Sequence, residues 1–468
     1  MNFFQQHYWS LYLDFIEEFK EVEYKGILIP LLCDFSCLLN NGNLVQEMQK
    51  SSFKDHLKNE IYSDTKIQPL FDKYIHKGTN QNPVNQSSGK ILLFEYVLRF
   101  PNNILKKYFD PSRTVILRTQ KSKGKNRVIP TIYLEPYKKD VSEQVKIYQE
   151  QIKDIILSTK SSRFLKKNNN LIEKFTEVIP ELLDNLVALD RFFEEVPISC
   201  IIVGTTEDPI SRSIVTMANS KGIPSICMQH GLIMKEEGYF PVFSTIQAVY
   251  GEYEKAWYIN KGLLEKRIEM VGHPRFEELF SKKRITSSLK KDLRVKYGKK
   301  RVLIATQPNS FLEWKELIEH LVMDHTNEII IKPHPLELNN KGFRYYKMLS
   351  SKYRAVKIAS NLHLYDILPT VDVVVVNSST VGLEAMLFGK PIIVFKHGIN
   401  TNYFDKLGEF VQSEPRKIAE NINNVFYNES FKNYYETIRK EFLSFAYPQS
   451  FSGNCLIELV NKLTTETR

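Results

Sequence analysis

The feature that most constrains this chain is a series of short apolar runs, each followed by an amphipathic stretch, between residues 199 and 395. The first two runs, 200–204 and 225–229, are separated by a helix-like stretch at 209–219. Strand, helix and strand in this order indicate parallel neighbouring strands, because a parallel pair needs a crossover connection. Consecutive apolar positions further indicate strands that are covered by helices on both faces.

The same pattern restarts after a basic stretch at 280–298. The sequence therefore predicts an α/β fold with two doubly wound, Rossmann-like domains that face a central cleft. The first domain is expected at 1–279 and the second at 280–445, with a C-terminal helix at 446–468 that packs back on the first domain. Further strands are predicted at 301–306, 328–332, 355–358, 372–377 and 391–395.

The first 190 residues show weaker patterns. Helical periodicity occurs at 8–24 and along 141–195, and apolar runs indicate strands at 90–95 and 114–118. Nothing in this region identifies an acceptor or a ligand.

Composition narrows the class of protein. The chain has 468 residues and 43% of them are apolar, which excludes disorder and allows more than one core. No run of roughly eighteen apolar residues marks a membrane-spanning helix. The beginning of the sequence lacks the basic segment, apolar run and cleavage site of an export signal. We therefore expect a cytoplasmic protein.

The formal net charge of +10 suits anionic partners such as nucleotides or phospholipid head groups. Lysine clusters at 121–125, 166–167 and 282–284 lack the spaced aromatic residues of a base-stacking surface, so no nucleic acid is expected. These clusters fit either a solvated surface or peripheral attachment to the inner face of a membrane. The five cysteines are scattered, which argues against a disulfide framework, and no second pair completes a metal site with Cys33 and Cys37.

A histidine follows one predicted strand, at the edge where parallel sheets bind ligands. His334 lies between two prolines directly after the strand 328–332, so its imidazole sits on a stiff turn and is placed to donate a hydrogen bond to a phosphate. Lys332, at the end of the same strand, is a candidate second contact to that phosphate. Taken alone, His334 is better explained as a loop histidine between two helix breakers.

Hydroxyl side chains follow the strand 372–377 in the same way. Ser378, Ser379 and Thr380 begin a helix, where unpaired first-turn amides form an anion site. An ordinary helix cap is the simpler explanation. Glu384, one turn further, is either an acceptor of hydrogen bonds from a ribose or a surface glutamate.

The first domain offers candidates for proton transfer. His230 follows the strand 225–229, and Gly231 lets the backbone turn directly after the imidazole. A histidine with a pKa near neutrality is a suitable general base toward a hydroxyl. Glu236 and Glu237, on a nearby loop, are alternative bases or plain exposed carboxylates.

These residues resemble the motifs of the GT-B superfamily, in particular bacterial surface-polysaccharide glycosyltransferases and CDP-glycerol phosphotransferases. The resemblance covers about residues 200–445, and it rests on the order of Gln229-His-Gly231, Gly251-Glu-Tyr with Trp257, Val271-Gly-His-Pro-Arg-Phe276, Lys332-Pro-His-Pro335 and Ser378-Ser-Thr-Val-Gly-Leu-Glu-Ala with Gly389-Lys-Pro391.

Bacterial sialyltransferases of this fold use an acidic pair followed by Gly as the base, and His-Pro and Ser-Ser/Thr motifs for the nucleotide phosphate. Glu236-Glu-Gly238, His334-Pro335 and Ser378-Ser379 are similar to these in the same order. In the CDP-glycerol polymerases a Trp-His-Gly histidine matches His230, where this chain has Gln229 in place of Trp.

The resemblance implies a glycosyltransferase that moves a sugar from a CMP-, CDP- or UDP-linked donor to a hydroxyl of a glycan or lipid-linked acceptor. The reaction is expected to be inverting and to need no metal or other cofactor. Three alternatives stay open: a CDP-glycerol glycerophosphotransferase, a non-hydrolysing sugar-nucleotide 2-epimerase, and an inactive binding protein with the same fold.

Overall fold

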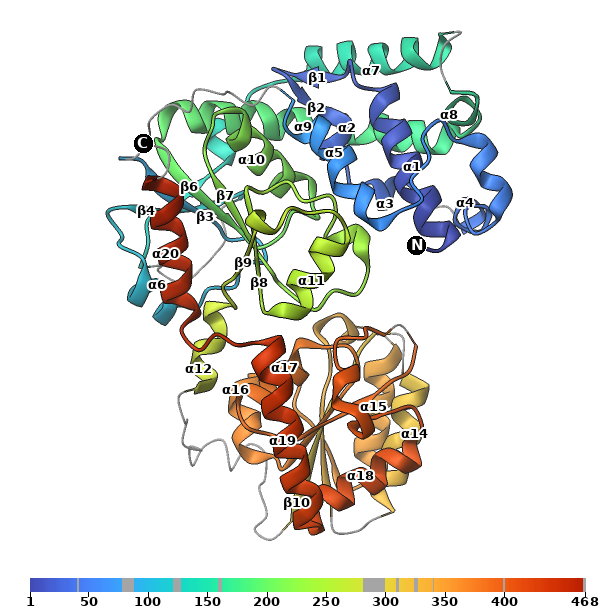
Figure 1. The fold of residues 1–468 in the computed structure, drawn as a ribbon, viewed down its shortest axis with the longest axis vertical. Helices are drawn as coiled ribbons and strands as arrows, with labels where there is room; N and C mark the ends of the chain where they lie inside the picture. Colours follow the sequence, from blue (N-terminus) through green and yellow to red (C-terminus); the bar gives the residue numbers. More distant parts are fainter. Residues whose placement is uncertain are drawn as a thin grey trace.

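The protein consists of two lobes, one above the other in Figure 1. The computed structural model describes residues 1–39, 42–77, 88–120, 128–158, 162–280, 299–308, 311–323, 327–339, 341–398 and 400–465. The lysine clusters at 121–125 and 282–284 and almost all of the basic stretch at 280–298 lie outside these residues. No helix in the described ranges is long and apolar enough to cross a membrane.

The upper lobe is built on a sheet of seven parallel strands in the order β5-β4-β3-β6-β7-β8-β9. From β3 the chain builds the sheet toward one side, through β4 and β5, and then returns to add β6 on the other side of β3. The loops after β3 and β6 therefore diverge, and the point between them is the switch point of the sheet. The strands are β3 (Lys90–Phe94), β4 (Thr114–Arg118), β5 (Thr131–Tyr133), β6 (Ile198–Val203), β7 (Ser225–Met228), β8 (Ile246–Val249) and β9 (Ile268–Met270).

The lower lobe repeats this plan with six parallel strands in the order β12-β11-β10-β13-β14-β15. Its switch point lies between β10 and β13. The strands are β10 (Lys300–Ala305), β11 (Asn327–Lys332), β12 (Val356–Ile358), β13 (Val373–Val376), β14 (Ile392–Phe395) and β15 (Val411–Gln412).

Alternation along each strand explains why both faces of the upper sheet are covered. In β6, Ile201 and Val203 join the cluster formed with α9 (Asn169–Glu195) and α10 (Pro209–Ser220). Cys200 and Ile202 point the other way, toward α6 (Asn102–Tyr108) and α20 (Ser452–Thr465). The C-terminal helix α20 thus packs on the upper lobe, beside α6 in Figure 1.

Helices cover both faces of the lower sheet as well. One face packs on α14 (Phe311–Val322), α15 (Lys341–Lys352) and α18 (Pro415–Tyr427). The other packs on α16 (Leu364–Ile367), α17 (Thr380–Leu387) and α19 (Glu429–Ala446), and α19 also contacts α11 (Glu252–Asn260) of the upper lobe.

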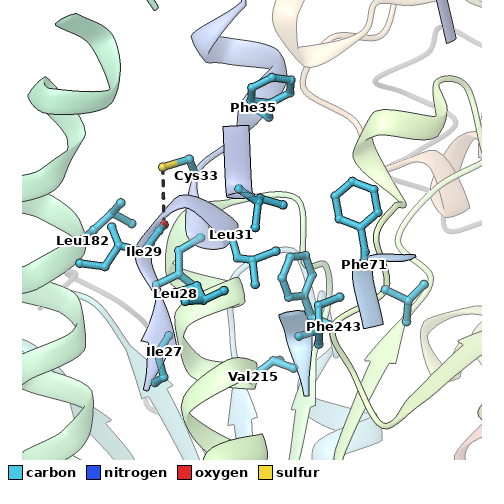
Figure 2. Packing of buried hydrophobic residues seen from close by; sticks show 14 of the residues in the cluster. Ile27, Leu28, Ile29, Leu31, Cys33, Phe35, Phe71, Leu182, Val215 and Phe243 are labelled. Atoms are coloured by element: carbon cyan, nitrogen blue, oxygen red, sulfur yellow. Dashed lines mark hydrogen bonds between the residues drawn. The ribbon is translucent and has the colours of Figure 1, made fainter. Parts of the chain in front are cut away.

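A helical layer formed by the N-terminal segment covers one side of the upper lobe. Figure 2 shows Leu31 of this segment near Phe243, and Phe35 and Val215 of α10 belong to the same buried cluster. The segment contains α1 (Phe3–Glu18), β1 (Glu23–Tyr24), β2 (Ile27–Leu28), α2 (Ile29–Leu32), α3 (Phe35–Leu38), α4 (Gly42–Glu47) and α5 (Ile67–Ile75), and α7 (Ser142–Leu157) and α8 (Arg163–Lys167) complete it.

The predicted fold class is confirmed, and the predicted strands occur with small shifts at their ends. The helix expected at 8–24 is α1, which begins earlier because Asn2 caps it by accepting a hydrogen bond from Gln5 N at 2.9 Å. The stretch 141–195 divides into α7, α8 and α9. Strand β5 was not predicted, since a three-residue, partly buried edge strand carries no clear alternation.

Candidate active site

One cleft of about 710 Å³ lies where the two sheets face each other. Six of the residues that line it follow the carboxyl ends of six strands, three from each sheet. They are Arg99 after β3, Glu207 after β6, His230 after β7, Gln307 after β10, His334 after β11 and Ser378 after β13. Open parallel sheets bind ligands at this edge, at the switch point. Both switch points therefore face the same cleft.

His334 occupies the lower wall of the cleft. Its Nδ1 accepts a hydrogen bond from Leu336 N at 3.2 Å, so the proton of the neutral ring is on Nε2. Burial lowers the pKa of His334, although Glu337 acts in the opposite direction. The residue is thus a neutral imidazole, and among the described residues its Nε2–H has no hydrogen-bond acceptor.

Glu337 positions the turn that carries His334. Its buried carboxylate accepts hydrogen bonds from His334 N at 2.8 Å, Thr306 Oγ1 at 2.6 Å and Tyr346 Oη at 3.0 Å. The sequence interpretation missed this residue. A carboxylate three positions after a helix cap is the sequence signal of a capping box, and it was available here.

The start of α17 forms the wall beside His334, and Ser378, Ser379 and Thr380 all line the cleft. Ser379 caps the helix by accepting a hydrogen bond from Val381 N at 3.3 Å, which leaves its own O–H available as a donor. The Ser378 hydroxyl instead donates to Asn377 Oδ1 and accepts from Thr401 N. It therefore links the loop before α17 to the backbone at Thr401.

Two residues expected at the donor phosphate or ribose do not reach the cleft. Lys332 donates from Nζ to the carbonyls of Ser360 and Leu362, at 3.1 and 2.7 Å, and burial lowers its pKa. Glu384 is buried and hydrogen bonds with Tyr365. Neither residue lines the cleft, because these partners hold both side chains away from it.

His230 faces these groups from the upper lobe. Its ring stacks on Tyr239 with a centroid distance of 5.5 Å. Burial, followed by the positive charges of Arg99 and Arg275, lowers the pKa of His230 to about 4. The imidazole is therefore neutral near pH 7 and a weaker base than an ordinary histidine.

The two neighbouring glutamates of the first domain point in different directions. Glu237 lines the cleft, and burial raises the pKa of its carboxyl. Glu236 is buried: it accepts a hydrogen bond from Trp9 Nε1 at 2.6 Å and forms an ion pair with Lys261 at 2.5 Å. Glu236, an expected alternative base, thus joins the N-terminal helix to the upper lobe and lies outside the cleft.

Two further charged residues at the upper switch point were not anticipated from the sequence. Glu207 lines the cleft, and burial together with the charge of Asp34 raises the pKa of its carboxyl. A methyl group on Gly238 would lie 3.2 Å from Glu207 Oε1, so Glu207 lies close to the loop that carries Glu237. Arg99, in the loop after β3, is the second of these residues and also lines the cleft. Both residues lie in loops that follow predicted strands, which was the available signal.

The N-terminal segment closes one side of the cleft, although its sequence suggested no ligand site. It contributes polar, aliphatic and aromatic side chains from three helices and the loops beside them: Phe4, Tyr8, Ser36, Cys37, Leu39 and Val45. All five cysteines of the chain are free thiols, as expected.

Two Rossmann-like domains whose ligand-binding edges share one cleft define the GT-B fold, and solved structures agree. A putative UDP-N-acetylglucosamine 2-epimerase from Listeria monocytogenes has a TM-score of 0.54 at 13% identity over 81% of this chain and 97% of its own. S. aureus MnaA with UDP has a TM-score of 0.52 at 11% identity, over 81% and 96%. UDP-GlcNAc 2-epimerase from Neisseria meningitidis, bound to UDP-GlcNAc, has a TM-score of 0.50 at 14% identity, over 81% and 99%. At these identities the likeness shows the fold.

A sequence match adds a narrower relation. Residues 313–408 match the family model described as capsule polysaccharide biosynthesis protein. The matched segment contains His334 and the start of α17, and thus the lower wall of the cleft. No curated protein shows significant sequence similarity to this chain.

Proposed function

We propose that this protein is a glycosyltransferase of capsule-type polysaccharide synthesis, which transfers a sugar from a nucleotide-activated donor to a hydroxyl of a glycan acceptor. One observation carries the proposal: His334 and the start of α17 line the same cleft as His230 and Glu237, on opposite lobes. The match of residues 313–408 to capsule polysaccharide biosynthesis proteins supports the biological setting.

The lower wall suits the phosphates of the donor. The Nε2–H of His334, the Ser379 hydroxyl and the N-terminus of α17 lie along the same wall of the cleft, and the helix dipole favours negative charge there. As the bond between the anomeric carbon and the phosphate oxygen breaks, the leaving phosphate gains charge that these groups stabilise. We propose that this stabilisation needs no divalent ion.

The upper wall suits the acceptor. Glu237 accepts the proton of the attacking hydroxyl, whose oxygen forms the new bond to the anomeric carbon. We prefer Glu237 to His230 because burial moves the pKa of the carboxyl upward, toward neutrality, whereas the pKa of His230 falls to about 4. His230 then acts as a neutral hydrogen-bonding group. Attack from the lobe opposite the phosphate inverts the configuration of the sugar.

Thermal unfolding with a panel of UDP, CDP, CMP and GDP compounds tests the donor site. A nucleotide at a hundredfold over its dissociation constant stabilises a protein by about 2.7 kcal/mol. We expect one nucleotide to do so, and His334→Ala to abolish the shift. His320→Ala is the matched control, because His320 is an exposed histidine of the same domain. Equal stabilisation of H334A and wild type would remove the donor-site assignment.

The same samples separate transfer from epimerisation. With the nucleotide sugar that binds, a transferase releases nucleotide only when an acceptor glycan is present, and EDTA leaves the rate unchanged. Interconversion of the nucleotide sugar without any acceptor would instead identify an epimerase and overturn the proposal.

A further inference from the structure

The loop between β3 and α6 holds an arginine in an unusual backbone conformation. Val97 and Arg99 have φ angles of 58° and 54°, in the left-handed region. This region is unfavourable for residues with a side chain, and most of all for a β-branched residue such as Val97. Such strain persists where the surrounding structure imposes it, and it is concentrated at functional sites.

Packing on both sides of Arg99 imposes this conformation. Leu98 and Phe100 are buried in the core beneath the sheet, and Phe100 packs on His273 with a ring distance of 5.5 Å. Gly204, directly after β6, lets the loop lie close: a methyl group there would be 2.5 Å from Leu98 N. Because its two neighbours are anchored in the core, Arg99 is directed into the cleft.

The Arg99 guanidinium has no ion pair or hydrogen bond with any residue in the described part of the chain, and it is exposed to the cleft. A second arginine lies behind it. Arg275 has two guanidinium nitrogens, Nε and Nη2, that are buried without a hydrogen-bond partner among the described residues. Buried polar groups are normally paired, so the unpaired nitrogens of Arg275 leave hydrogen-bonding capacity next to Arg99. The carboxylate of Glu384 acts on both arginines and offsets part of their charge.

We propose that Arg99, with Arg275 behind it, forms a second oxyanion subsite, which binds a phosphate or carboxylate carried by the acceptor. This inference rests on the proposed function, which assigns the donor phosphates to the lower wall. Arg99 belongs to the opposite lobe and lies at the switch point next to Glu207. A guanidinium presents parallel N–H donors that match either oxyanion in a bidentate manner.

The electrostatics of the neighbouring groups agree with this location. Burial and the charge of Arg275 lower the pKa of Arg99, while Glu384 acts in the opposite direction on both arginines. The two arginines contribute to the low pKa of His230, and Arg99 also lowers the pKa of His334 on the lower wall. A bound oxyanion would relieve this repulsion between like charges. The subsite therefore predicts an acidic acceptor, such as a uronic acid residue or a phosphorylated sugar.

Titration calorimetry with two probes, inorganic phosphate and glucuronate, tests the subsite in the full-length protein, with and without the nucleotide that binds the lower wall. We expect at least one probe to bind, and to bind also when nucleotide is saturating. Arg99→Gln should weaken that binding by about tenfold to a hundredfold, the loss expected for a charge-assisted hydrogen bond. Arg99→Lys keeps the positive charge but loses the two parallel N–H donors of the guanidinium. Its affinity for the probe should therefore lie between those of wild type and Arg99→Gln.

Arg113→Gln is the matched control for the loss of one positive charge, because Arg113 is exposed just before β4, at the opposite edge of the sheet. It should bind the probes within twofold of wild type. Preference for phosphate or for glucuronate identifies the oxyanion of the acceptor, and either preference supports the subsite.

Two results would overturn the subsite. The first is equal probe binding by R99Q and R113Q. The second is that nucleotide displaces both probes and that R99Q also binds nucleotide more weakly, which would assign Arg99 to the donor site. Failure of every nucleotide to bind wild type would instead overturn the proposed function. Loss of probe binding in R99Q would still support the oxyanion subsite in that case.

Discussion

Glu236 and Glu237 are adjacent in sequence, yet the structure gives them different environments, and Glu236→Gln and Glu237→Gln should separate them. Glu236 accepts from Trp9 Nε1 and from Lys261 Nζ, one on each oxygen. A glutamine has one carbonyl oxygen, so its NH₂ group faces one of the two donors in either orientation. The Glu237 carboxylate accepts a hydrogen bond from its own backbone N–H, which the carbonyl oxygen of a glutamine can also accept.

The cost of Glu236→Gln follows from these contacts. Breaking a buried ion pair costs about 3–5 kcal/mol, and a hydrogen bond to a charged group contributes about 1.5–3 kcal/mol. Lys261 still forms an ion pair with Asp64 in this variant. We therefore expect Glu236→Gln to lower the free energy of unfolding by about 3 kcal/mol, the lower end of the range for a buried ion pair. Glu237→Gln should change stability by less than about 1 kcal/mol.

Urea unfolding, followed by far-UV circular dichroism, gives both free energies if the slope m is unchanged between variants. Transfer rates are then measured below the unfolding range of E236Q. We expect E236Q to keep its kcat and E237Q to lose about 10²–10⁴-fold, the usual contribution of a general base. The assignments would be wrong if E236Q were as stable as wild type, or if E237Q kept its kcat.

Three further outcomes are expected. First, the pKa of His230 falls from 6.5 to about 4 on folding. Between these two pH values the unfolded chain therefore binds more protons at His230 than the folded chain does. The contribution of His230 to the free energy of unfolding thus declines as the pH drops from 6.5 to 4. The difference in unfolding free energy between wild type and His230→Asn should change by about 3 kcal/mol across this window, and a flat difference would contradict the burial argument. Second, Gly204→Ala should cost about 1–3 kcal/mol of stability through its contact with Leu98 N, and it should weaken phosphate or glucuronate binding by displacing Arg99; an unchanged urea midpoint would refute this packing. Third, Glu337→Gln should reduce nucleotide binding without contacting the nucleotide, because it loosens the turn at His334; calorimetry of E337Q against wild type checks this, and equal affinities would remove the positioning role.

Local chemistry explains why the sequence could place His334 and the start of α17 at the ends of buried strands. His334 is held by flanking prolines and by its own helix cap, and the first hydroxyls of α17 are held by the cap at Ser379. Each of these depends on residues within a few positions of the chain, and periodicity in the apolar runs was enough to place them at the ends of buried strands.

Side-chain direction was not available from such local patterns. Lys332 and Glu384 occur in the expected elements, but contacts made elsewhere in the lower domain turn them away from the cleft. Glu236 depends on Trp9 and Lys261, which are far away in the sequence. A local pattern cannot tell which of two adjacent carboxylates will find such partners.

Amino-acid order alone was therefore sufficient for the two-domain α/β plan, because strand burial and helix caps are short-range properties that leave a periodic trace. Folding in three dimensions was needed to join Arg99 to Arg275 and Glu207 to the loop of Glu237, and to lay the N-terminal helices along the cleft. These pairings depend on the order of the strands in each sheet and on the position of one lobe relative to the other. Neither of these is encoded in a stretch of a few residues.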